Sequence, residues 1–436
     1  MSPDAPPAGW QGGTTRDGAP ARVHATASGV RVGKPREWAR WRPGRWWTVG
    51  LEEELMLLEP SSWRLAQASE DVLASLPVEL AARASMETHA GALELSTGVH
   101  DRTAGAVAEL AGLRRRLAEF LGALGLRVGA AGMHPFAQWQ DTRIASGVRP
   151  GLVHESMREL ARREPTFALH VHVGVGDPEV AIRIADRLSA HVPLLLALSA
   201  NSPFWQGRDS GLASARTPLF GMFPRTGIPP RFGSYDAWVD AVTTMIDSGA
   251  ISEPTFLWWD VRPQPRFGTV EVRVMDAQTT LSDVAGLTAL ILCLARLEGE
   301  GFTPEAVLDA PAVLSENRFL AARDGLHADL IDPCRRRRVP VRRLLNEVLI
   351  AATPYARQLG CADELELVEG LAQRAPADRQ RLLARAPGGL ATVVPALSDA
   401  FTSITRAARI VSPARQAWAA GGAEGSPRHA TSTAAR

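Results

Sequence analysis

Short segments in which apolar and polar residues alternate recur along the chain and predict strands. The predicted strands cover residues 47–58, 92–96, 127–132, 167–175 and 269–275. Longer stretches with apolar residues three and four positions apart predict helices at residues 103–124, 179–199, 283–299 and 339–359. A sheet with polar residues on one face and long helices against the other indicates an α+β fold.

Two terminal segments differ in composition from the rest of the chain. Residues 1–43 are rich in Gly, Pro, Ala and Arg without hydrophobic periodicity, which predicts a disordered leader, and residues 416–436 predict a similar tail. No comparable linker and no repeat of fixed period interrupts the middle. We therefore expect residues 44–415 to form a single domain, for which a chain of 436 residues is ample.

Charge and composition exclude several classes of function. Lys and Arg number 48 against 47 Asp and Glu, and the near-neutral balance argues against a strongly basic nucleic-acid binder. The run from Arg335 to Arg338 has no interleaved aromatic residues and is interpreted as a solvated face beside a helix start. The single lysine, Lys34, lies in the predicted leader, so Schiff-base and P-loop chemistry have no lysine in the domain.

Cysteine usage and hydropathy indicate the cellular compartment of the protein. The three cysteines are far apart and form no C-x-x-C pair, which is typical of a protein of the reducing cytosol. The chain begins without the pattern of a signal peptide, and no apolar run reaches about 18 residues. We expect a cytoplasmic protein that binds neither membrane nor nucleic acid.

Acidic and imidazole side chains gather on the predicted polar faces. Glu52 and Glu54 share one face of the first strand about 7 Å apart, whereas Glu53 interrupts its apolar face. His170 and His172 likewise share a face. Neighbouring carboxylates repel unless a cation neutralises them, and imidazole is a common metal ligand.

Two further segments add to this pattern. Glu271 and Arg273 point away from the apolar face of the strand at 269–275, and the segment from residue 86 to 96 supplies Glu87 and Glu94. Each pair alone is also typical of an ordinary solvated strand face. Together the four segments predict a metal-dependent site on an open polar sheet face.

Six motifs in order resemble those of the carboxylate-amine ligases, also called type 2 glutamate-cysteine ligases, relatives of glutamine synthetase. The motifs are GLEEELMLLEP from Gly50, ALELSTGVH from Ala92, GMHP from Gly132, HVHVGVGDPE from His170, ALSANSPFWQGRDSGLASAR from Ala197 and GTVEVRVMD from Gly268. The resemblance implies a glutamine-synthetase-like catalytic domain, with a curved antiparallel sheet, helices on its outer face, and ATP and two magnesium ions bound.

The resemblance also implies roles for individual residues. The implied metal ligands are Glu52, Glu54, Glu87, Glu94, His170 and Glu271. Arg273 corresponds to a phosphate-facing arginine, His172 is a candidate contact to nucleotide or substrate, and Arg262 and Arg216 are candidates for holding the transferring phosphate or substrate carboxylates. Arg262 has the alternative interpretation of a structural pair with Asp260.

The reaction implied by the resemblance is ATP-dependent joining of a carboxylate to an amine. The γ-phosphoryl group of ATP passes to the carboxylate, an amine attacks the acyl phosphate, and a γ-glutamyl amide, ADP and phosphate result. Glutamate and cysteine are the default small-molecule substrates, and a homodimer is expected from relatives. Three alternatives stay open: a different acid and amine pair, a two-metal hydrolase, and a non-enzymatic sensor of amino acids or nucleotides.

Overall fold

The computed structural model describes residues 36–163 and 165–402. Its compact unit begins at Trp38, earlier than the expected domain start at residue 44. The reason is aromatic packing: Trp38 lies edge-on to Trp238 and Trp41 edge-on to Tyr235, each with ring centroids 5.7 Å apart. Most of the predicted leader, and the whole predicted tail at 416–436, lie outside the described residues.

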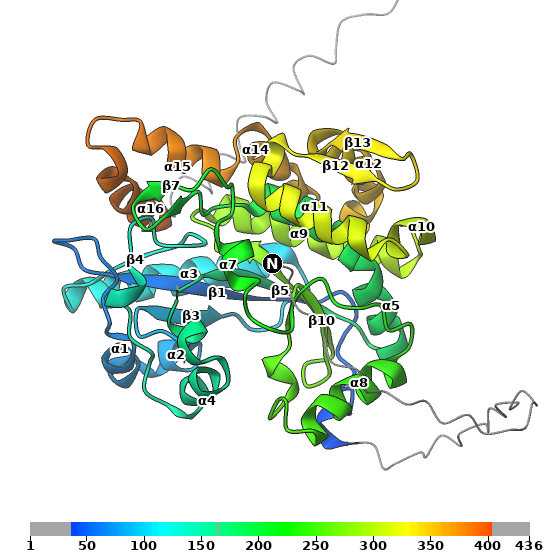
Figure 1. Cartoon of the computed structure of the whole chain (residues 1–436), viewed down its shortest axis with the longest axis horizontal. Coiled ribbons are helices and arrows are strands. Elements are labelled where there is room, and N and C mark those ends of the chain that lie inside the picture. Colours follow the sequence, from blue (N-terminus) through cyan, green and yellow to red (C-terminus); the bar gives the residue numbers. More distant parts are fainter. Residues whose placement is uncertain (1–35, 164, 403–436) are drawn as a thin grey trace, which may run out of the picture. The chain divides into compact units, whose positions relative to one another are not determined.

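The main sheet has seven antiparallel strands within the described residues, in the order β10-β11-β5-β1-β3-β2, with β4 pairing with β1 (Figure 1). The strands are β1 (Val49–Leu58), β2 (Ala84–Met86), β3 (Ala92–Ser96), β4 (Arg127–Gly129), β5 (Ala168–Gly174), β10 (Val261–Gln264) and β11 (Thr269–Asp276). The five predicted strands are therefore confirmed, while β2 and β10 were not predicted.

Helices cover the apolar face of this sheet. They are α3 (Thr103–Ala123), α5 (Pro178–Leu188), α6 (Val192–Ser199) and α9 (Leu281–Gly299). Valines of β5 and β11 pack with their apolar residues in one continuous core. This arrangement confirms the α+β class and the prediction of helices on one face of an antiparallel sheet.

The predicted helix at 179–199 is divided into α5 and α6. Asp177 caps α5 by accepting a hydrogen bond from the backbone N–H of Val180 at 2.9 Å. A 3-10 turn at Ser189–His191 then separates the two helices. Pro193 lies at the start of α6, where its missing N–H costs no helical hydrogen bond.

Further helices and three small strand pairs surround the sheet and these four helices. The helices are α1 (Ser69–Ser75), α2 (Val78–Ala81), α4 (Val148–Met157), α7 (Arg216–Phe220), α8 (Tyr235–Asp247), α10 (Glu305–Leu308), α11 (Pro311–Asp324), α12 (Val341–Leu359), α13 (Ala362–Glu366), α14 (Val368–Gln373), α15 (Pro376–Ala384) and α16 (Val393–Thr402). Three two-stranded pairs are β6 (Phe204–Trp205) with β7 (Arg208–Asp209), β8 (Thr226–Gly227) with β9 (Trp258–Trp259), and β12 (Asp329–Asp332) with β13 (Arg337–Pro340). In the described part of the chain, no helix combines the length and apolarity that crossing a bilayer requires.

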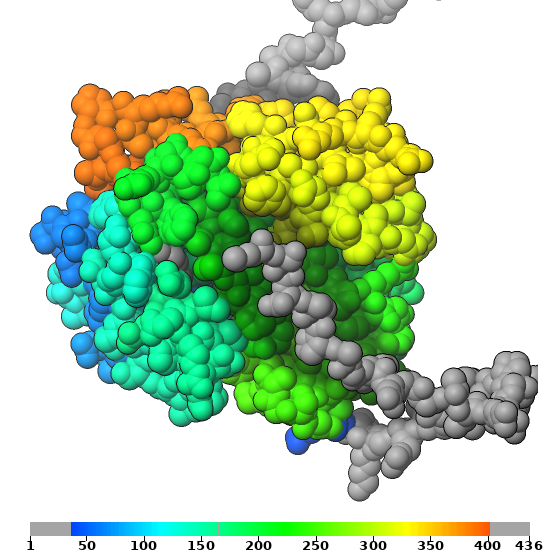
Figure 2. Space-filling model, viewed as in Figure 1, coloured from blue at the N-terminus to red at the C-terminus, as the bar shows by residue number. Residues whose placement is uncertain are grey.

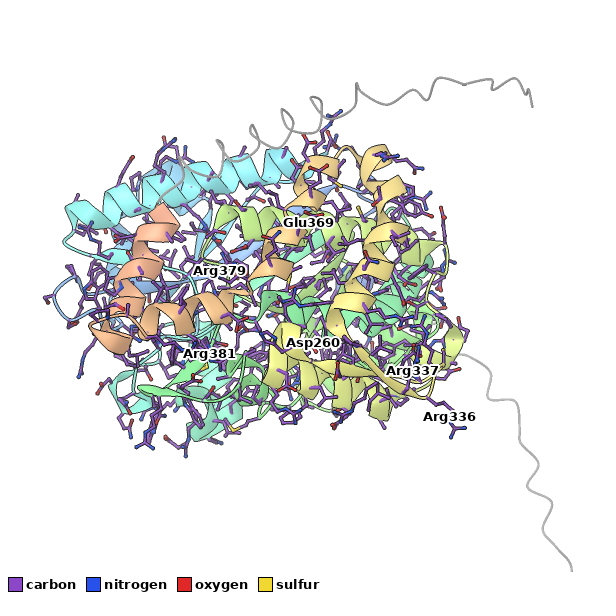
Figure 3. All side chains as sticks on the ribbon, turned by 90° about the horizontal axis from the view of Figure 1, so that it is seen from above. Asp260, Arg336, Arg337, Glu369, Arg379 and Arg381 are labelled. Carbon is purple, nitrogen blue, oxygen red and sulfur yellow. The ribbon has the colours of Figure 1, made fainter. Side chains whose placement is uncertain are left out.

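The arginine run lies on the β12–β13 hairpin just before α12. Arg335 pairs with Asp332 at 3.1 Å and with Glu347 at 3.2 Å. Figure 3 shows the side chain of Arg336 projecting beyond the body of the protein, and Arg337 is also exposed. The run is thus an exposed face beside a helix start, as the sequence predicts.

One ion pair is buried within the apolar face of the sheet. Glu53 of β1 accepts hydrogen bonds from Arg114 Nε of α3 at 2.8 and 3.1 Å, and both side chains have 0% exposure. Arg114 also donates to the backbone oxygens of Thr279 at 3.0 Å and Gln278 at 2.8 Å. The glutamate that interrupts the apolar alternation is therefore compensated by one fully bonded arginine.

Candidate active site

Strand register brings the polar side chains of five strands together on the other face of the sheet. Glu52 of β1 lies opposite His170 of β5, and Glu54 lies opposite Glu94 of β3. On the other side of β5, His172 lies opposite Glu271 of β11, which in turn lies opposite Arg262 of β10. Alternation along each strand points these side chains to the same face.

The first group, which we call the Glu271 cluster, contains Glu52, His170 and Glu271. One potential ligand atom of each residue lies within 4.8 Å of the others. His170 Nδ1 is 3.3 Å from Glu52 Oε2 and 3.9 Å from Glu271 Oε1. The residues come from three adjacent strands, so their backbones hold them in place.

The second group, the Glu94 cluster, contains Glu54, Glu94 and again His170, within the same 4.8 Å limit. His170 Nε2 is 3.7 Å from Glu54 Oε1. The other Glu54 oxygen accepts the backbone N–H of Ala168 at 2.7 Å, and Glu94 accepts the Ser85 hydroxyl at 2.8 Å. The two clusters therefore meet at a single imidazole.

The protonation of the acids reflects this crowding. Burial, together with Glu52, Glu87 and Glu54, raises the pKa of Glu94 well above its usual value. Burial and Glu54 raise the pKa of Glu87 to about 8. Glu87 follows β2 and lies outside both clusters in the described structure.

The donor set of the clusters fits a divalent cation. His170 Nε2 and His172 Nε2 are buried and have no hydrogen-bond partner among the described residues. Carboxylate oxygens are the ligands that Mg²⁺ prefers, and a cation would offset the mutual repulsion of these acids. The residues present therefore fit a bound Mg²⁺.

The sequence analysis placed Glu271 on an open polar face. In the structure its side chain is instead fully buried, with 0% exposure. It accepts hydrogen bonds from Arg262 Nε at 2.7 Å, Arg273 Nη1 at 2.5 Å and Gln264 Nε2 at 2.6 Å. Although burial raises its pKa, Arg262 and Arg273 hold the pKa of Glu271 well below its usual value. Two of these donors belong to the unpredicted strand β10.

The alternative pairing of Arg262 with Asp260 is wrong. Arg262 binds Glu271 and also donates to the backbone oxygen of Thr255 at 3.3 Å. Asp260 instead binds Arg318 of α11, with Oδ2 to Nε at 2.6 Å and Oδ1 to Nη2 at 3.1 Å. Asp260 is buried, with 4% of the residue exposed.

Arg216 begins α7 and is buried against β11. Its Nη1 donates to the Val274 oxygen at 3.1 Å and its Nη2 to the Arg273 oxygen at 3.5 Å. The Nε atoms of Arg216 and Arg273 are buried without a hydrogen-bond partner among the described residues. Each arginine thus retains one donor for a group that the protein itself does not supply.

Asp276 was missed by the sequence analysis. It accepts the backbone N–H of Asn201 at 2.7 Å and the hydroxyls of Ser202 and Ser214 at 2.7 and 2.9 Å. Burial raises the pKa of Asp276 despite Arg216 nearby. Asp276 therefore ties the segment from Asn201 to Arg216 to the end of β11, and only its place in the last motif gave a signal.

His172 makes one hydrogen bond, and its second nitrogen faces a carboxylate without a hydrogen bond among the described residues. Its Nδ1 lies 3.0 Å from the Thr269 hydroxyl, and its Nε2 lies 3.4 Å from Glu52 Oε1. Burial alone would lower the pKa of His172, but Glu52 and Glu271 raise it above its usual value. Thr269 and Gln264 are further site residues that only the strand register reveals.

A family model described as glutamate-cysteine ligase family 2 matches residues 48–396. The chain belongs to this family. It is 42% identical over 81% of its length to the Rubrobacter xylanophilus protein named "Putative glutamate--cysteine ligase 2-3", covering 97% of that protein. It is also 37% identical over 82% of its length to the Thermobifida fusca protein named "Putative glutamate--cysteine ligase 2", covering 92% of it.

Solved structures share the fold of this glutamate-cysteine ligase family 2 member. The Francisella tularensis glutamate-cysteine ligase, in complex with AMP, superposes with a TM-score of 0.64 at 15% identity, over 87% of this chain and 95% of that one. A bifunctional glutathione synthetase of Pasteurella multocida gives 0.58 at 15% identity, over 82% of this chain and 51% of that one. The family prediction made from the motifs is confirmed.

Proposed function

We propose that the protein is an ATP- and magnesium-dependent carboxylate-amine ligase that joins glutamate to cysteine through an acyl phosphate. The observation that carries the proposal is the pair of acidic clusters that meet at His170. Arg273 is bound to Glu271 of the first of these clusters. Membership of the glutamate-cysteine ligase family supports the choice of substrates. The AMP in the Francisella tularensis complex supports a nucleotide as the phosphoryl donor.

The chain's own residues would act by positioning and by charge. Glu52, Glu54, Glu94, His170 and Glu271 would hold Mg²⁺, which when bound neutralises charge on a transferring phosphoryl group. Glu87 lies close enough to raise the pKa of Glu94 and would join the Glu94 cluster when Mg²⁺ binds. Arginine is suited to this chemistry because its planar fork binds oxyanions without losing its proton.

The unpartnered donors of two arginines indicate where an oxyanion would lie. Arg273 Nε and Arg216 Nε are buried with no partner among the described residues, and a phosphate or carboxylate oxygen would satisfy either. Arg262 is already engaged by Glu271, so its role would be to fix that carboxylate. His172 would contact nucleotide or substrate through its open Nε2.

The test is release of ADP and phosphate with Mg²⁺, glutamate and a panel of amines, with mass analysis of the product. Cysteine-dependent release with formation of γ-glutamylcysteine is the expected result. Release with another amine alone would keep the ligase mechanism and correct the substrate. Phosphoester or amide hydrolysis without nucleotide would replace the proposal by a two-metal hydrolase.

A matched pair of variants ties the activity to the clusters. Glu54→Gln removes a cluster carboxylate, whereas Glu59→Gln changes an exposed glutamate just beyond the same strand. We expect turnover to fall at least 100-fold in the first and to stay unchanged in the second. Equal activity in both would refute the site.

A further inference from the structure

A cavity of about 620 Å³ lies beside the sheet, between α5, α11 and the segment from Gly221 to Arg231. Figure 2 shows the surface hollowed between the yellow helices and the green segments below them. The volume lies within the range of small-molecule sites, roughly 300–1,000 Å³. None of the residues of the Glu271 and Glu94 clusters lines this cavity.

Two arginines line the cavity, and one of them, Arg231, is already paired with Glu305 at 2.6 Å and Asp309 at 3.0 Å. Arg318 of α11 uses Nε and Nη2 to bind Asp260, and in the described part of the chain its Nη1 makes no hydrogen bond. A guanidinium held on one side by a carboxylate is fixed in orientation and can present its remaining N–H groups to a second carboxylate.

Two acids line the cavity: Asp309 pairs with Arg231, whereas Asp186 has no ion-pair partner among the described residues, although Arg231 lies near enough to act on its pKa. Asp186 of α5 is 8% exposed and accepts the backbone N–H groups of Phe232 at 3.2 Å and Gly233 at 2.8 Å. Burial raises the pKa of Asp186. A buried carboxylate with spare acceptor capacity suits an ammonium group.

The remaining wall combines apolar residues with Ser189, Thr226, Ser315 and the Arg231–Asp309 ion pair. The apolar residues include Ile228, Pro229, Pro230, Leu308 and Leu314. Apolar walls with a few converging polar groups are typical of sites for small organic ligands. A ligand for this cavity therefore has one carboxylate, one ammonium and an apolar body.

We propose that this cavity binds a free α-amino acid with an apolar side chain, its carboxylate on Arg318, its ammonium on Asp186 and its side chain on Ile228 and Leu314. This ligand differs from glutamate and cysteine, and its binding requires neither nucleotide nor turnover. The site is therefore separable from the ligase activity proposed above.

The cavity is linked to the acidic clusters through Asp260. The Asp260 side chain binds Arg318, and its backbone oxygen accepts the N–H of Arg273 at 2.7 Å. The Asp260 N–H also donates to the oxygen of Gly227, a residue of the cavity wall, at 2.8 Å. An amino acid bound to Arg318 would thus be separated from Arg273 of the active site by Asp260 alone.

The test is calorimetric titration of the full chain, without nucleotide or metal, using L-leucine, L-valine and L-methionine. Leucinamide lacks the carboxylate and 4-methylpentanoate lacks the ammonium, so both should bind at least about tenfold more weakly than leucine. Absence of binding by all three amino acids, or equal binding of either analogue, would overturn the proposal.

Three variants locate the binding. Ser315→Trp places a large ring at an exposed position of the cavity wall and should abolish leucine binding, while Asp186→Asn should weaken it about tenfold or more. Ala312→Trp, exposed on the same helix but not lining the cavity, is the matched control and should bind as the parent does. With melting temperatures confirming folded protein, unchanged binding in the first two variants would refute the assignment.

Discussion

Replacing Arg114 with methionine should strongly destabilise the fold without touching the polar face. Arg114 is fully buried and, among the described residues, donates every hydrogen bond that the Glu53 carboxylate accepts; it also donates to the backbone oxygens of Gln278 and Thr279. Removing one partner of a buried ion pair costs about 3–5 kcal/mol. Each orphaned backbone oxygen adds about 1 kcal/mol or more.

The penalty has an upper limit set by protonation of Glu53. An isolated buried glutamate can take up a proton, which at pH 7 costs about 3–4 kcal/mol for a group whose usual pKa is near 4.3. In the variant the buried carboxyl has no counter-charge and burial disfavours its charged form, so stability would increase as the pH falls from 7 toward 5. We expect this gain to be about 1.4 kcal/mol per pH unit.

Denaturant unfolding at pH 7 and pH 5 measures both effects. The double variant Arg114→Met with Glu53→Leu leaves no buried charge and should recover most of the charge penalty. Arg335→Met, which breaks an ion pair with both side chains more than a third exposed, is the control and should cost less than about 1 kcal/mol. A loss below about 1 kcal/mol for Arg114→Met, or the same loss at both pH values, would refute this reasoning.

Four further results are expected. Glu271→Ala should abolish turnover and also lower the melting temperature, since two buried arginines lose their partner; unchanged activity would contradict the site. Mg²⁺ should raise the melting temperature of the parent protein but not of Glu94→Gln, as thermal denaturation would show. Burial lowers the pKa of His134 to about 4, so the fold should lose up to about 3 kcal/mol relative to His134→Gln as the pH falls from 6.5 to 4; a constant difference would exclude this cause. Asp276→Asn should lower kcat/KM about tenfold by loosening the segment that it anchors, and an unchanged value would remove that positioning role.

The sequence predicts the main strands because their alternation is a local property. Residues 269–274 alternate throughout and residues 49–55 alternate except at Glu53, so their polar residues can be assigned to one face without knowledge of the strand pairing. β10 has only four residues and contains Pro263, which weakens its strand pattern. Without β10, the burial of Glu271 beneath Arg262 and Gln264 could not be predicted.

Partners far apart in the chain are the second limit. Glu53 interrupts the apolar alternation of its strand. The alternation alone does not indicate that Glu53 pairs with Arg114 of a helix. In the same way Asp260 binds Arg318 on α11 rather than the nearby Arg262. Tertiary packing selects these pairs, and the periodicity of one segment contains no information on the position of another.

The meeting of both clusters at His170 makes them chemically unequal. Burial and Arg273 lower the pKa of His170, which favours the neutral ring. A neutral imidazole has one nitrogen with a lone pair and one that bears hydrogen. His170 can therefore be a ligand toward only one cluster at a time, and toward the other it is a donor to carboxylates. Exchanging the proton between Nδ1 and Nε2 would reverse which cluster has the extra ligand, so the tautomer of this one ring sets the order in which the two sets of acids could be filled.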